Sequence, residues 1–138
     1  MQVLDRVPAS APAGNLAAED RVAVELAVAQ WLGCAPVVQR AVASLRALGT
    51  ADDEVERIRR CGSARPNLQR ILRFAVALII TRGRPQPLDL RRVAAVPRDA
   101  LFEIARVSTH TFAQCSLAFT TAALGGDTDR ILCDIGDL

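Results

Sequence analysis

Apolar residues recur along this chain at helical spacing, and no segment shows the sustained alternation that a half-buried strand requires. Residues 19–32 are apolar on almost every side, which is typical of a buried helix. A second helix is predicted from Pro36 to about Leu48, because proline suits the first helical turn and Gly49 suits the residue after a helix. The pattern therefore favours an all-α protein.

Four further helices complete the predicted set of about six. The segment from Thr50 to Asp53 has the spacing of a capping box and predicts the start of a helix that ends before Gly62. Helices are also predicted over residues 67–81, 88–94 and 98–124, with the breaker RGRPQP at 82–87 between the first two. The predicted buried face of the last helix consists of Leu101, Ile104, Ala105, Ser108, Phe112, Cys115 and Phe119.

The chain is long enough to form one domain with its own core. Residues 1–18, rich in proline, alanine and serine, are predicted to form an extended arm, and residues 19–138 a single helical domain. Hydrophobic residues make up 51% of the chain, yet its longest apolar run, Phe74–Ile80, is far shorter than the roughly 18 residues of a membrane span. We therefore expect no membrane insertion, and expect instead that copies of the chain cover one another's apolar faces in a homo-oligomer.

Charge and cysteine usage narrow the functional classes further. All 17 basic residues are arginine, but the net charge is only +2, so the sequence does not predict nucleic-acid binding. The arginines at positions 82, 84, 91, 92 and 98 favour a solvated connecting face over an anion site. The four cysteines lack zinc-type spacing, and no secretory signal is evident. We predict a cytoplasmic protein with reduced thiols, no intramolecular disulfide, and neither metal nor cofactor.

Cys34 is the first candidate for chemistry, because it directly precedes the predicted helix at Pro36. Unpaired N–H groups at a helix N-terminus favour a thiolate, the reactive form of cysteine. The alternative is a buried, inert thiol, since cysteine behaves as a small hydrophobe in protein cores. Trp31, three residues earlier, is interpreted as a core or interface anchor.

The order of these segments resembles the alkylhydroperoxidase D-like group of the carboxymuconolactone decarboxylase superfamily. The resemblance rests on an apolar helix, Gly-Cys, and a helix that ends in glycine fifteen residues after the cysteine. It continues through DDEVERIRR, LQRILRFAVALIITRG, LDLRRVAAV and RDALFEIARVSTHTFAQ, and covers about residues 19–120. It implies an alkylhydroperoxidase D-like helical bundle, commonly a trimer or hexamer, with peroxidase-type antioxidant activity on a small-molecule substrate.

Redox-active members carry Gly-Cys-x-x-Cys-x-x-x-His and a glutamate twelve residues before the first cysteine. Cys34 matches the first cysteine, but the other three positions hold Val37, Ala41 and Val22. Without a resolving cysteine in the motif, a thiol peroxidase would need an external thiol or a cysteine of a partner subunit to recycle it. Glu25, one helical turn beyond Val22, is a possible substitute for the missing glutamate, although it could equally pair with an arginine.

His110 is the only histidine of the chain. If the last helix packs against the first two, as the resemblance implies, His110 approaches the Cys34 region; otherwise it has no catalytic role. Three functions stay open: a thiol-dependent peroxidase that uses Cys34, a non-redox enzyme in which Glu25 or His110 moves protons on a small carboxylated lactone held by arginines, and a catalytically silent oligomer that binds a small ligand or a protein partner.

Overall fold

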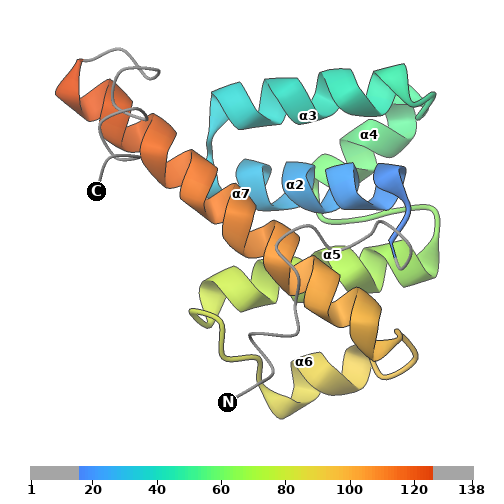
Figure 1. Ribbon diagram of the computed structural model, residues 1–138. Helices are drawn as coiled ribbons and strands as arrows, with labels where there is room; N and C mark the ends of the chain where they lie inside the picture. The colour runs from blue at the N-terminus through green and yellow to red at the C-terminus, as the bar shows by residue number, and fades with distance from the viewer. Residues whose placement is uncertain (1–15, 126–138) are drawn as a thin grey trace.

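The computed structural model describes residues 16–125, and within that range it contains six helices and no strand (Figure 1). The prediction of an all-α protein is therefore confirmed. No helix in this part of the chain is both long and apolar enough to cross a membrane. The helices are α2 (Ala18–Leu32), α3 (Ala35–Ala47), α4 (Asp52–Arg59), α5 (Pro66–Ile80), α6 (Pro87–Arg92) and α7 (Arg98–Leu124).

The predicted arm, residues 1–18, lies almost wholly outside the described residues. Its last three residues are described: Leu16 is buried in the core, and Ala18 already belongs to α2. The end of the chain after Gly125, which includes Cys133, also lies outside the described range.

Helix α2 is the centre of the fold, and it contacts α3, α4, α5 and α7 (Figure 1). The predicted burial of this segment is confirmed, because six consecutive or near-consecutive side chains lose all or nearly all of their solvent exposure. Three of the six are alanines, whose small side chains let neighbouring helices approach closely from several directions. These residues are Ala23, Val24, Leu26, Ala27, Val28 and Ala29.

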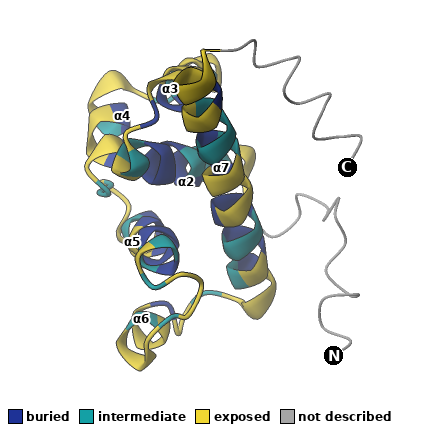
Figure 2. Cartoon of the chain, turned by 90° about the vertical axis from the view of Figure 1, so that its left-hand side faces the viewer, coloured by how far each residue is buried: buried dark blue, intermediate teal, exposed yellow. Residues whose placement is uncertain are grey.

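Helix α7 crosses the other helices diagonally and packs against α2, α5 and α3 (Figure 1). The predicted buried face of this helix is wrong in part, because Phe112 is 46% exposed and Phe119 is 47% exposed. Buried and exposed residues follow each other along α7 (Figure 2), as expected of a helix covered on one side. The buried face instead consists of Ala100, Glu103, Ile104, Val107, Ser108, Thr111, Cys115 and Thr121.

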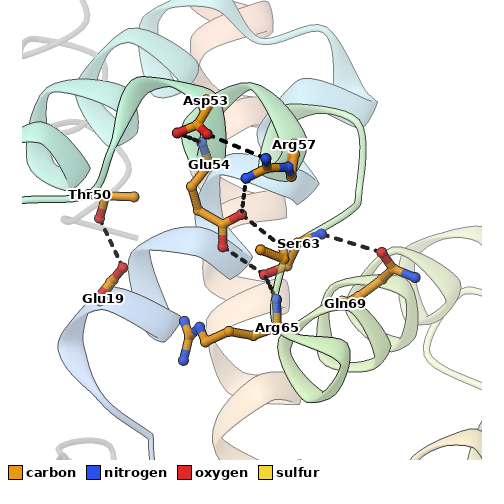
Figure 3. Close-up of polar contacts among 9 residues, drawn as sticks. Glu19, Thr50, Asp53, Glu54, Arg57, Ser63, Arg65 and Gln69 are labelled. Atoms are coloured by element: carbon orange, nitrogen blue, oxygen red, sulfur yellow. Dashed lines mark hydrogen bonds and ion pairs between the residues drawn. The ribbon is translucent and has the colours of Figure 1, made fainter.

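The predicted capping box at Thr50 is also wrong. Helix α4 starts one residue later, with Ala51 as its N-cap and no side-chain cap. The Thr50 hydroxyl instead donates a hydrogen bond of 3.0 Å to Glu19 in the first turn of α2 (Figure 3). A capping box does occur at the start of α6, where Gln86 N–H donates to the Asp89 carboxylate at 2.9 Å.

Glu54 on α4 holds the loop between α4 and α5 (Figure 3). Its carboxylate accepts hydrogen bonds from the Ser63 hydroxyl at 2.7 Å, from the Ala64 N–H at 3.0 Å and from Arg57 at 3.4 Å. Burial acts to raise the pKa of Glu54, but these hydrogen bonds and the Arg57 charge outweigh it and hold the pKa below its ordinary value. The ionised carboxylate therefore fixes the path of the chain into α5.

The arginines around the 82–87 breaker are exposed, as the sequence predicts. Side chains 82, 84, 91, 92 and 98 are all exposed, and none of them forms an ion pair with another residue of the 16–125 range.

Candidate functional site

Cys34 occupies the N-cap of α3, as the sequence predicts. Gly33 ends α2 in the left-handed conformation, with φ of 73°, and turns the chain so that α3 packs back on α2. The Cys34 N–H donates to the Ala29 carbonyl at 3.0 Å, and the Cys34 carbonyl accepts from the Val38 N–H at 3.0 Å. The side chain makes no capping bond to the helix and is 0% exposed. The backbone therefore fixes the position of this sulfur inside the core.

A second thiol, that of Cys115 on α7, lies close enough to Cys34 for the two groups to interact. Cys115 is 1% exposed and belongs with Cys34 to the buried core. Burial, together with the neighbouring Cys34 thiol, raises the pKa of Cys115 to about 12, while the Arg40 guanidinium acts in the opposite direction. All the cysteines in the described range, Cys34, Cys61 and Cys115, are free thiols. The fold thus creates a buried dithiol from residues on two different helices.

The motif positions that depart from the redox-active pattern are filled by core residues. Val37 is 5% exposed and Ala41 is 1% exposed, while Val22 is half-buried. These side chains pack in or against the hydrophobic core and carry no exchangeable proton. Any proton movement at the dithiol must therefore involve other residues.

Three polar residues from α3 and α7 form a chain of hydrogen bonds next to the dithiol. Arg40 donates to the Gln114 side-chain carbonyl at 2.6 Å, and the Gln114 amide lies 3.0 Å from Nε2 of His110. Because an amide nitrogen only donates, Nε2 of His110 accepts this bond. Arg40 also exerts its charge on Cys115. Arg40 and His110 are exposed and Gln114 is half-buried, so this chain lies at the surface beside the buried thiols.

Glu25 does not join this chain. It is half-buried on α2 and makes no hydrogen bond or ion pair with other residues between positions 16 and 125. The alternative in which Glu25 pairs with an arginine is therefore not found among the described residues. Trp31, predicted as a core or interface anchor, is 60% exposed and contributes nothing to the core of the single chain.

Among the described residues the buried carboxylate is instead Glu103, which no sequence pattern singled out. It is 5% exposed on α7 and accepts from Arg21 of α2 at 3.2 Å and from Arg106 at 2.7 and 3.1 Å. Hydrogen bonding and charge from Arg106, reinforced by Arg21, outweigh burial and hold the pKa of Glu103 below its ordinary value. This arrangement connects α2 to α7 and serves packing, because its three groups are already paired with one another.

The lowered pKa values of Glu54 and Glu103 predict acid destabilisation. In the unfolded chain both carboxyls regain an ordinary pKa of about 4.3, so they bind protons at a pH where the folded forms are still ionised. Their contribution to the free energy of unfolding is complete above the pKa of the unfolded state. It is lost as the pH falls through the pKa values of the folded state. Thermal unfolding followed at pH 6, 5, 4 and 3 should show this loss, and Glu103→Gln should make the decrease less steep. An identical pH profile for the variant would contradict the assignment.

No group of histidine, cysteine and carboxylate side chains in the described range is arranged to hold a metal ion. The groups that chemistry could use are the Cys34–Cys115 pair and the neighbouring Arg40, Gln114 and His110. Comparisons of the chain with protein-family models, with curated protein sequences and with solved structures found no match.

Proposed function

We propose that this protein is a thiol-dependent oxidoreductase of the peroxidase type, in which Cys34 and Cys115 cycle between a dithiol and a disulfide. The observation that carries the proposal is the burial of two thiols from different helices in one core, near enough for Cys34 to act on Cys115. Cys115 takes the role that the second cysteine of the resembled motif would have at position 37. The resolving thiol thus comes from α7 rather than from α3.

The proposed reaction consumes one peroxide per dithiol. The raised pKa of Cys115 suits it to the role of the protonated, resolving thiol, and Cys34 is therefore proposed as the sulfur that attacks. The Cys34 thiolate takes the outer peroxide oxygen and becomes a sulfenic acid, and the other product is an alcohol, or water from hydrogen peroxide. The Cys115 thiol then displaces water from the sulfenic acid to form the disulfide. An external dithiol reductant supplies the two electrons and two protons that restore the thiols.

Arg40 supports this chemistry through its charge. Its guanidinium acts on Cys115 and would stabilise negative charge that develops on sulfur when the disulfide is reduced again. The bond from Arg40 to Gln114 fixes the guanidinium between α3 and α7. His110, which is exposed, is proposed to exchange protons with solvent.

The wider proposal keeps the features implied by the resemblance: an alkylhydroperoxidase D-like bundle, a trimer or hexamer, a small-molecule substrate and a cytoplasmic location. Assembly is supported by the number of large apolar side chains that a single copy leaves exposed. They are Trp31, Leu48, Ile80, Leu88, Leu90, Phe102, Phe112, Phe119 and Leu124.

The test is to treat the reduced protein with one equivalent of hydrogen peroxide or cumene hydroperoxide at pH 7. A variant with Cys61→Ser and Cys133→Ser serves as the background, so that only the proposed pair remains. We expect loss of two thiols per chain, and a Cys34–Cys115 disulfide in the peptide map. Adding Cys115→Ser should leave a sulfenic acid on Cys34 that dimedone traps, and adding Cys34→Ser should abolish peroxide consumption.

Failure to consume peroxide faster than a free thiol would overturn the proposal. A disulfide that forms equally fast in the presence and absence of peroxide would also contradict it, because the pair would then be a passive target of oxygen. A turnover of carboxylated lactones that survives Cys34→Ser would favour a non-redox enzyme instead.

A further inference from the structure

A groove between α5 and α7 offers a binding site that the dithiol chemistry does not use. Its volume is about 600 Å³, within the range of small-molecule sites. One wall is the end of α5 with the turn that follows it, and the other is the middle of α7. Leu78, Ile79, Ala105 and Phe112 provide a mostly apolar lining.

The polar side chains of the groove differ in what they can offer a ligand. Ser108 and Thr109 donate their hydroxyl protons to the carbonyls of Ile104 and Ala105, at 2.7 and 2.9 Å. Arg82 is the only charged residue in the lining, and its side chain makes no hydrogen bond or ion pair with another residue in the described part of the chain. The groove therefore combines an apolar surface with a single cation whose donors are available.

The backbone fixes Arg82 at this position despite a conformational cost. Arg82 has φ of 57° and Gly83 has φ of 80°, so two successive residues adopt the left-handed conformation. For a residue with a side chain this conformation is unfavourable, and such residues concentrate at ligand sites. Hydrogen bonds from the N–H groups of Arg82 and Gly83 to the carbonyls of Ile79 and Leu78, at 3.2 and 2.6 Å, close the turn on the end of α5.

We propose that this groove binds an amphipathic organic anion, a medium-chain alkyl carboxylate, with the chain on the apolar walls and the carboxylate on Arg82. Charge complementarity selects the anion, because the lining carries one guanidinium and no carboxylate. The apolar walls select an alkyl chain rather than a small polar acid, since each methylene that leaves water for an apolar surface favours binding. The proposal is independent of the peroxidase proposal, because neither cysteine lines the groove.

The test is binding of decanoate, below its micelle concentration, to the full chain by isothermal titration calorimetry. We expect saturable binding of one decanoate per chain. Arg82→Gln should weaken it by about tenfold or more, the loss expected for one charge-assisted hydrogen bond. Decanol should bind less tightly than decanoate and be indifferent to Arg82→Gln. Arg84→Gln is the matched control, because Arg84 is exposed two residues away and does not line the groove.

A second experiment tests the proposal by filling the groove with a larger side chain. Ala105→Phe places a ring in the groove from α7 and should weaken decanoate and decanol alike, with thermal unfolding used to confirm that the variant folds. Absence of saturable decanoate binding to the unmodified protein would overturn the proposal. So would equal effects of Arg82→Gln and Arg84→Gln on decanoate, or an equal effect of Arg82→Gln on decanoate and decanol.

Discussion

Replacing Glu103 by alanine is expected to lower the free energy of unfolding by about 3 kcal/mol, the cost typical of removing one member of a buried ion pair. Glu103 accepts three hydrogen bonds from two arginines, and its side chain is 4% exposed. Without it, the Arg21 guanidinium stays on the interface of α2 and α7 with its charge uncompensated. Arg21 is 27% exposed, so water offsets part of this penalty. Urea unfolding at pH 7 followed by circular dichroism measures the change.

Glu56→Ala is the matched control for this substitution. Glu56 also pairs with an arginine on its own helix, Arg59 at 3.2 Å, but its side chain is 57% exposed. Exposed pairs of this kind contribute about 0.3–0.5 kcal/mol, so the control should barely move the midpoint. If Glu103→Ala cost no more than Glu56→Ala, the carboxylate would not stabilise the contact of α2 with α7.

The helices of this protein are largely predictable because local signals mark their ends. Proline in the first turn and glycine after the last predict α3 within one residue of its observed bounds, Ala35–Ala47. The last helix was predicted over the observed range, Arg98–Leu124, from Pro97 and the glycine pair at 125–126. Thr50 shows the limit of such signals. Its hydroxyl bonds instead to Glu19, on another helix. A pattern of four consecutive residues cannot show that such a competing partner is present.

The buried face of α7 is predictable only in part, because the hydrophobicity of a side chain does not by itself determine how deeply it is buried. Phe112 was assigned to the core and is nearly half exposed, whereas Thr111, its neighbour, is 0% exposed. The Thr111 hydroxyl donates to the Val107 carbonyl at 2.8 Å, so a polar side chain is buried without an unsatisfied group. Glu103 is buried for a related reason, since Arg21 and Arg106 compensate its charge. In both cases burial depends on a hydrogen-bonding or charged partner, which the periodic spacing of apolar residues does not reveal.

The candidate site, too, is predictable from the sequence only in part. The position of Cys34 at the start of a helix follows from the local sequence, and the structure confirms it. The proximity of Cys115 follows from the packing of α3 against α7, which no spacing of cysteines reveals. The resemblance directed attention to positions 37 and 41, where no chemistry exists, because it places both thiols on one helix. A cysteine on the predicted buried face of the last helix was the one available signal.

The largest core effect is expected at Leu26, in the middle of α2. Leu26→Ala should lower the free energy of unfolding by about 3 kcal/mol, within the range of 2–5 kcal/mol measured for such truncations in cores. The side chain is 0% exposed, and α2 is packed by four other helices, so the surroundings have little freedom to move into the space left behind. Chemical denaturation of the purified variant gives the value.

Leu48→Ala is the control, because it removes the same atoms from a site that is 49% exposed at the end of α3. Its cost in the single chain should stay below about 1 kcal/mol, since less apolar surface returns to water and no cavity forms. The difference between the two variants measures how far α2 is the centre of the fold. Equal losses would mean either that Leu48 is covered by another copy of the chain or that α2 relaxes on truncation. Sedimentation of Leu48→Ala separates these cases, because only the first changes the assembly state.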